Sequence, residues 1–250
     1  FASANAGEKG YDSRSFLWTM GLYAVVALPM FLITGFFTKE RITLTPEQQK
    51  VPFKDTVKAV ASNGHLMIIF AFLLTMLMGL FGRIGVMFFY CTYILGDMRL
   101  MAPVMLAFQI GSMAGQFIFP PFALKLGKSR MLIISAIISG CLLLAIFFFG
   151  DTSMPVLYAL QFLYGLAGFA APITLAMIPY AVDHYELKHG IRADGTSYAT
   201  VSLSTKIASA FGGAVSLYIM GFFGYDGAAK VQTAEAMTGI NVAANLVPAV

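Results

Sequence analysis

Long apolar blocks separated by short polar segments dominate the chain. The complete blocks cover residues 15–37, 66–95, 101–124, 131–149, 155–181 and 196–223, and a further apolar run begins near Met237. A helix rises 1.5 Å per residue, so about 20 apolar residues cross the roughly 30 Å hydrocarbon core of a bilayer. The weaker alternating pattern of an outer-membrane barrel is absent. The pattern predicts an all-α, polytopic membrane helix bundle.

Composition supports a membrane protein and argues against a soluble enzyme. Of the 250 residues, 58% are hydrophobic and 11% are charged, and the mean hydropathy is +0.78. A soluble domain carries about 25% charged residues. The net charge of +4 does not indicate nucleic acid as a partner, because the basic residues lie mostly in short loops, where they orient membrane helices.

The basic residues also predict the orientation of the helices. One side of the membrane receives ten Lys and Arg residues and the other receives four. The richer side should be cytoplasmic. The ten are Lys39, Arg41, Lys50, Lys54, Lys58, Lys125, Lys128, Arg130, Lys188 and Arg192, and the four are Lys9, Arg14, Arg99 and Lys230.

Three regions follow from this arrangement. Residues 1–37 form an external stub and one helix, residues 38–65 form a cytoplasmic segment with a short amphipathic helix at the membrane interface, and residues 66–250 form an incomplete helix bundle. An ordinary long loop is the alternative for residues 38–65. The chain begins at Phe1 and stops at Val250 inside an apolar run, so we expect both ends to be cut from a longer protein.

Two cations lie deep within predicted spans. Arg83 and Lys206 each occupy a position where insertion of a charge costs about 2.5 kcal/mol or more. All twelve carboxylates fall in loops or at span ends, so none is available mid-membrane as a partner. We therefore expect counter-charge from a segment outside this chain, from an anionic ligand or from water in a cavity. The alternative is that each side chain extends to the headgroup layer.

Polar residues repeat at helical spacing on several spans. Taken together, these polar faces predict the walls of a polar chamber whose helices are weakened by proline, which is the usual construction of a transporter site. Each face alone is also explained by helix packing. Glycine and serine residues share these faces. The candidate substrate-binding residues are Lys206, Arg83, Ser202, Tyr90, Gln161, Tyr164, Gln109 and Gln116.

Motifs for catalysis are absent from the sequence. It contains no H-E-x-x-H, no glycine-rich phosphate loop after a strand, no G-x-S-x-G and no paired intramembrane carboxylates. We therefore expect no catalytic residue, no bound metal and no cofactor, and an enzyme is not predicted.

One stretch resembles a known signature. The run A-M-I-P-Y-A-V-D-H-Y-E-L-K at residues 176–188, followed by Gly190, Arg192, Asp194 and Tyr198, is similar to that of the glycoside-pentoside-hexuronide:cation symporters of the major facilitator superfamily, which include melibiose permease. Supporting stretches are residues 39–41, 93–97 and 127–130. The resemblance covers essentially the whole chain and implies helices 6 to 11 and the start of helix 12, that is, the C-terminal six-helix half with the central loop before it.

The resemblance also implies roles for individual residues. Lys206 matches a helix-11 lysine near the sugar and cation sites of melibiose permease, and Ser202 lies where a threonine neighbours it. A cytoplasmic gate is implied at Asp183, Glu186, Arg192 and Asp194, to which we add Lys128 and Arg130. Two positions depart from the pattern, because Tyr180 replaces a frequent aspartate and Ala171 replaces a tryptophan that contacts sugar.

The main functional hypothesis is cation-coupled symport of a sugar or glycoside by alternating access, in a bacterial inner membrane. The coupling cation, Na⁺ or H⁺, would bind in the N-terminal half, which carries the family's cation-binding aspartates and is the expected partner. In one version Arg83 recognises a hexuronide. The alternatives are a lipid or lysolipid transporter of the same fold and a non-transporting membrane sensor or scaffold.

Overall fold

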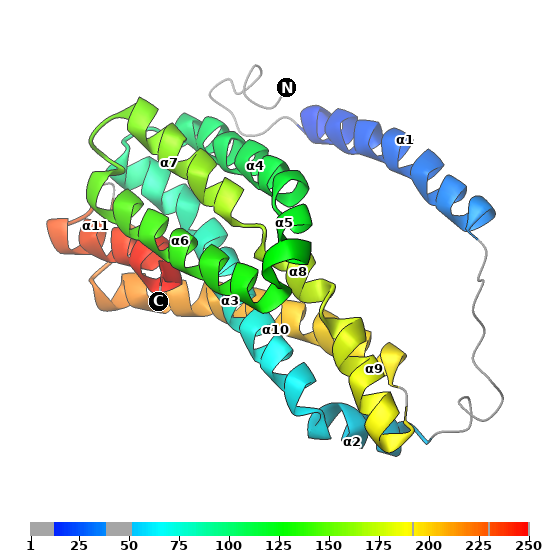
Figure 1. Ribbon diagram of the computed structural model, residues 1–250. Helices are drawn as coiled ribbons and strands as arrows, with labels where there is room; N and C mark the ends of the chain where they lie inside the picture. Colours follow the sequence, from blue (N-terminus) through cyan, green and yellow to red (C-terminus); the bar gives the residue numbers. More distant parts are fainter. Residues whose placement is uncertain (1–12, 39–51, 192, 230, 250) are drawn as a thin grey trace. The chain divides into compact units, whose positions relative to one another are not determined.

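The computed structural model describes residues 13–38, 52–191, 193–229 and 231–249 (Figure 1). Contacts divide the chain into two units, residues 1–50 and residues 51–250. Helix α1, Ser13–Phe37, is the described element of the first unit and carries Pro29 in its interior. Within the described residues, every regular element is helical.

The second unit consists of consecutive helices joined by short connections (Figure 1). The longer helices are α3 (Gly64–Phe89), α4 (Met101–Ile118), α6 (Lys128–Phe149), α7 (Met154–Ala167), α9 (Ile178–His189) and α10 (Asp194–Phe222). The shorter helices are α2 (Phe53–Ser62), α5 (Pro120–Leu126), α8 (Ala170–Leu175) and α11 (Ala234–Asn241). Single turns of π- or 3₁₀-helix complete the set: η2 (Tyr90–Ile94), η3 (Met98–Leu100), η4 (Val242–Leu246) and η5 (Val247–Ala249).

Two helix pairs form the most extensive contacts, α3 with α10 and α4 with α7. Glycines bring their backbones together, as in other membrane bundles. A Cβ at Gly82 would lie 2.9 Å from the Gly212 carbonyl oxygen, and one at Gly165 would overlap the Phe108 carbonyl oxygen. Each pair therefore packs backbone against backbone.

Two predicted spans are interrupted, and proline lies at each break. The third changes direction at Phe119, between α4 and α5, where Pro120 begins the new helix. The fifth is divided into α7, α8 and α9, and Pro179 lies in the first turn of α9. Proline lacks the N–H group that would bond the carbonyl four residues earlier, so each of these prolines removes a backbone hydrogen bond at the break.

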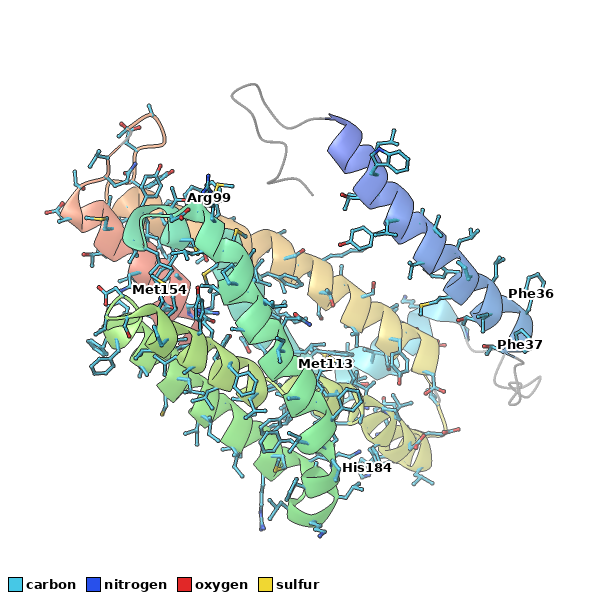
Figure 2. The ribbon with its side chains drawn as sticks, turned by 90° about the horizontal axis from the view of Figure 1, so that it is seen from above. Phe36, Phe37, Arg99, Met113, Met154 and His184 are labelled. Carbon is cyan, nitrogen blue, oxygen red and sulfur yellow. The ribbon has the colours of Figure 1, made fainter. Side chains whose placement is uncertain are left out.

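The described residues contain six candidate membrane spans, at Leu17–Phe37, Gly64–Ile94, Met98–Ile118, Lys128–Phe149, Met154–His189 and Asp194–Phe222. These confirm the prediction of an all-α polytopic bundle. Figure 2 shows Arg99 and Met154 near one end of the second unit and His184 toward the other. The sidedness predicted from the basic residues stays a prediction.

The short helix expected before the bundle is present as α2, and its apolar side packs on protein. Ala59 and Val60 are buried in a cluster with Ile178 and Val182 of α9. The side of α2 that carries Ala59 and Val60 thus packs on α9. The expected position of this helix at the membrane interface stays a prediction.

Candidate functional site

Arg83 lies in the interior of the second unit. Only 2% of the residue is exposed. Its Nη2 donates hydrogen bonds to Gln161 Oε1 at 3.2 Å and to Asn245 Oδ1 at 3.3 Å. Its Cζ lies 4.6 Å from the centre of the Tyr164 ring. These four residues, called the Arg83 cluster below, connect α3, α7 and η4, and their burial excludes extension of Arg83 to the lipid headgroups.

Neutral groups surround this charge. Asn245 Nδ2 donates to Asn241 Oδ1 at 2.8 Å, and Asn241 Nδ2 donates to the Phe147 carbonyl at 3.0 Å. Within the described residues, Arg83 Nε and Gln161 Nε2 have no hydrogen-bond partner. In the part of the chain that the structure describes, the partners of Arg83 are therefore two carboxamides and an aromatic ring, none of which carries a negative charge. The counter-charge expected from another segment, from an anionic ligand or from water stays a prediction.

Tyr90 is also buried, with 1% of its surface exposed. It occupies the π-helical turn η2 that ends the span begun by α3. A Cβ at Gly150 would lie 2.6 Å from the Tyr90 hydroxyl, so this ring packs closely against the end of α6. Tyr90 therefore occupies the core of the bundle in this structure.

Helix α10 has three different faces. The face toward α3 consists of small buried residues, namely Ser204, Ala208, Gly212 and Ser216. A second face is apolar and exposed, with Leu203, Ile207, Phe211 and Tyr218. At 100° per residue, the stripe containing Ser202, Lys206 and Ser209 falls between these two faces, and all three of its residues are exposed. The apolar face suits lipid, whereas a lysine within a span needs a polar surrounding.

Helix α4 repeats this arrangement. Gly111 and Gly115 are buried against α7, and Leu106, Ile110, Met113 and Phe117 form an exposed apolar face. Gln109, Ser112 and Gln116 lie between them, with Gln116 Nε2 donating to Ser112 Oγ at 3.1 Å. Two helices of the bundle thus carry a polar stripe beside their packed face.

A cavity of about 480 Å³ lies beside the polar stripe of α4. Ser112 and Gln116 line it, together with Phe108 and Tyr164. The Tyr164 and Phe108 rings are stacked, with their centroids 5.4 Å apart. Other lining residues come from α3, α6, α8 and η5, including Thr75, Ser139, Ala171 and Pro248. Tyr164 therefore belongs to the Arg83 cluster and also lines the cavity.

The residues assigned to a cytoplasmic gate occupy α6, α9 and the start of α10. The ammonium of Lys128 donates to the Ala176 carbonyl at 3.0 Å and lies 3.7 Å from the centre of the Tyr180 ring. Asp183 and Arg130 are exposed, whereas Glu186 and Asp194 are half-buried. Arg192 lies outside the described residues.

The structure brings some predicted residues together and leaves others apart. Arg83, Gln161 and Tyr164 meet in one cluster, and Gln116 and Tyr164 share the cavity wall. Lys206 lies on α10 and is not among the residues that line this cavity. Sequence reasoning missed Asn245 and Phe108. A polar residue inside the apolar run after Met237 was the available signal for Asn245.

Comparison with known proteins identifies the family. Residues 3–250 match the profile of the family described as MFS/sugar transport protein. The chain belongs to this family. The match confirms the predicted resemblance and, with the six candidate spans, an integral protein of the bacterial plasma membrane.

Individual relatives are identical to this chain at about a quarter of the aligned positions. The chain is 27% identical to the glucuronide carrier protein homolog of Escherichia coli over 246 residues, which cover 98% of this chain and 53% of the relative. It is 27% identical to the isoprimeverose transporter of Lactiplantibacillus pentosus over 241 residues, which cover 93% of this chain and 49% of the relative. It is 26% identical to the putative sulfoquinovose importer of Salmonella typhimurium over 217 residues, which cover 80% of this chain and 44% of the relative. The chain spans about half the length of the curated relatives it matches, in agreement with one half of a major facilitator fold.

Proposed function

We propose that the chain is part of a secondary active transporter, not an enzyme, and that the whole protein couples entry of a sugar or glycoside to Na⁺ or H⁺. The observation that carries the proposal is the exposed polar stripe around Lys206 on a membrane-spanning helix. A lysine on such a helix is stable when it faces a hydrated chamber or a partner segment. Alternating access to that chamber is the corresponding mechanism.

In this proposal, Lys206 and Ser202 face the chamber shared with an N-terminal half. The ammonium offers hydrogen bonds to sugar hydroxyls, or it pairs with a carboxylate of the N-terminal half when no cation is bound. Occupation of the cation site then changes the charge network that the sugar meets, which couples the two affinities. The division into residues 1–37, 38–65 and 66–250 belongs to the same proposal.

A second contribution comes from the cavity wall formed by α4 and α7. Stacked Tyr164 and Phe108 offer an aromatic surface, and Gln116 offers a carboxamide beside it. Sugar sites commonly combine such apolar faces with a few polar groups that fix orientation. Arg83 would not contact the sugar itself but would fix the position of the Tyr164 ring through its cation–π contact. Relatives named for a glucuronide and for sulfoquinovose keep an acidic sugar among the candidate substrates.

Uptake measurements on the full-length protein in proteoliposomes test the proposal. Radiolabelled neutral and acidic glycosides are supplied with an imposed Na⁺ or H⁺ gradient, and accumulation must collapse when the gradient is removed. We expect Lys206→Ala to reduce accumulation at least tenfold, because the coupled charge is lost. Lys54→Ala is the matched control, since Lys54 is exposed on α2 outside the spans.

Two outcomes would contradict the proposal. Normal accumulation by Lys206→Ala would remove this residue from the coupling mechanism. Absence of gradient-driven uptake of every glycoside, together with movement of fluorescent lysolipid between leaflets, would favour a lipid transporter of the same fold instead.

A further inference from the structure

The start of α6 carries positive charge at the end of a helix where charge of that sign is unfavourable. Lys128 is the first residue of α6, Arg130 is the third, and no acidic residue occupies the first turn. The exposed N–H groups of a helix N-terminus favour anions, not cations. The ammonium of Lys128 therefore gains by pointing to another element.

That element is the bend between α8 and α9. Lys128 Nζ donates to the carbonyl of Ala176, the residue that caps the C-terminal end of α8. Pro179 has no N–H group, so the Leu175 carbonyl, four residues earlier, has no regular helical donor at this bend. A cation is favoured at a helix C-terminus for the same electrostatic reason that disfavours it at the N-terminus. Lys128 thus adds a hydrogen bond to the carbonyl next to the one that Pro179 leaves without a helical donor.

A second contact fixes the direction of the lysine. Its Nζ lies 3.7 Å from the centre of the Tyr180 ring, within the range of a cation–π interaction. Tyr180 belongs to the first turn of α9, so one ammonium group contacts both sides of the bend.

We propose that Lys128 and Tyr180 form a cation–π brace that sets the angle between α8 and α9 and so positions the cytoplasmic segment α9 during transport. Helix α9 carries Asp183 and Glu186, the gate candidates, so its angle determines where these carboxylates lie. Lys128 and Tyr180 are positioning residues that act through α9. This inference rests on the proposed function for its transport readout, but its structural readout is independent of any substrate.

Spin labels on two exposed positions measure the brace directly. Leu124 of α5 and Leu187 of α9 are 83% and 88% exposed, so labels on Leu124→Cys and Leu187→Cys report the α5–α9 distance by pulsed electron paramagnetic resonance. The background is the full-length protein with Cys141→Ser and its other accessible cysteines replaced. We expect Lys128→Met and Tyr180→Leu to broaden the distance distribution and to lower the maximal uptake rate about fivefold.

Three companion variants separate the brace from a general effect on folding. Tyr180→Phe keeps the aromatic face and should retain the narrow distribution and the wild-type rate. Tyr180→Asp replaces the ring with a carboxylate that can pair with Lys128, and it should also retain the narrow distribution. Lys125→Met is the control, because Lys125 is exposed nearby at the end of α5.

The outcomes are distinct. An unchanged distribution in Lys128→Met, or a Tyr180→Phe variant that behaves like Tyr180→Leu, would overturn the brace. A wild-type protein that transports no sugar but whose distribution responds to these variants would refute the proposed function while leaving the brace in place.

Discussion

The Arg83 cluster shows how one charged residue is accommodated within an apolar bundle. Its guanidinium is planar and delocalised, and it is less strongly hydrated than a lysine ammonium. Two carboxamide oxygens accept hydrogen bonds from the guanidinium, and the face of the Tyr164 ring contacts it. Removing a partner of a buried charge costs more than removing an ordinary polar contact.

We therefore expect Asn245→Leu to lower the stability of the folded protein by about 2 kcal/mol, since a hydrogen bond to a charged group contributes about 1.5–3 kcal/mol. Thermal unfolding in detergent measures the change. Thr238→Val on the exposed side of α11 is the control, because its hydroxyl bonds only the Ala234 carbonyl within the same helix. Equal melting of Asn245→Leu and the wild type would show that Asn245 does not stabilise Arg83.

At this scale the sequence predicted part of the cluster. The spacing of Gln161 and Tyr164 placed them on one face, and the depth of Arg83 marked it as unusual. The charge pattern of the sequence marks carboxylates as partners for a cation, and it gives no sign of a neutral partner such as Asn245. A carboxamide can stabilise a buried guanidinium without cancelling its charge, and a count of charges does not detect it.

At the scale of secondary-structure elements, the pairing of helices depends on glycines. Gly111 and Gly165 face each other across α4 and α7 so closely that a Cβ on either would overlap backbone of the other helix. Overpacking of this kind costs about 1–3 kcal/mol where neighbours can shift, and backbone shifts less readily than side chains.

We expect Gly165→Ala to reduce the yield of folded protein and to lower its melting temperature by several degrees, about what a loss of 2 kcal/mol produces in a domain of this size. Gly85→Ala is the matched control, because it is also helical and a Cβ there has no neighbour within 4 Å. That control should be neutral or slightly stabilising. A Gly165→Ala protein as stable as Gly85→Ala would contradict the close packing of α4 and α7.

Asn63 joins α2, α3 and α9. Its Oδ1 accepts from Leu66 N and caps α3, while its Nδ2 donates to the Ala181 carbonyl of α9 at 2.8 Å. Asn63→Asp keeps the capping acceptor but turns an oxygen toward the Ala181 carbonyl. We expect both Asn63→Ala and Asn63→Asp to speed amide hydrogen exchange in α9, and only Asn63→Ala to weaken the first turn of α3 as well. Identical exchange in both variants would contradict this division of roles.

At the scale of the whole molecule, hydropathy alone predicted the number of candidate spans in the described residues, and it predicted their ends within a few residues except in the third and fifth, which end at Ile118 and His189. It did not predict the breaks at Phe119 and Ala176, because an apolar run keeps its hydropathy through a bend. Nor did it predict which polar face meets protein and which meets open space, since that depends on the partner helix. Contacts such as those of Asn245 and Phe108 arise between segments far apart in the chain, where periodicity carries no information.

The predicted orientation has its own test. Leu187 of α9 should label from the cytoplasmic side, and Val231, which is 84% exposed, should label from outside. A membrane-impermeant maleimide added to intact cells should therefore react with Val231→Cys and leave Leu187→Cys unreacted until the cells are opened. The reverse pattern would show that the bundle is inverted.

The glycine contacts have a mechanical consequence. Where two helices touch backbone to backbone, neither can rotate or slide without displacing main-chain atoms of the other. We therefore expect α3 with α10, and α4 with α7, each to move as one rigid pair. Any change of shape must then be absorbed where the chain is already discontinuous, at Phe119, Gly168 and Ala176. Stiffening one of those joints would slow the molecule without altering anything that it binds.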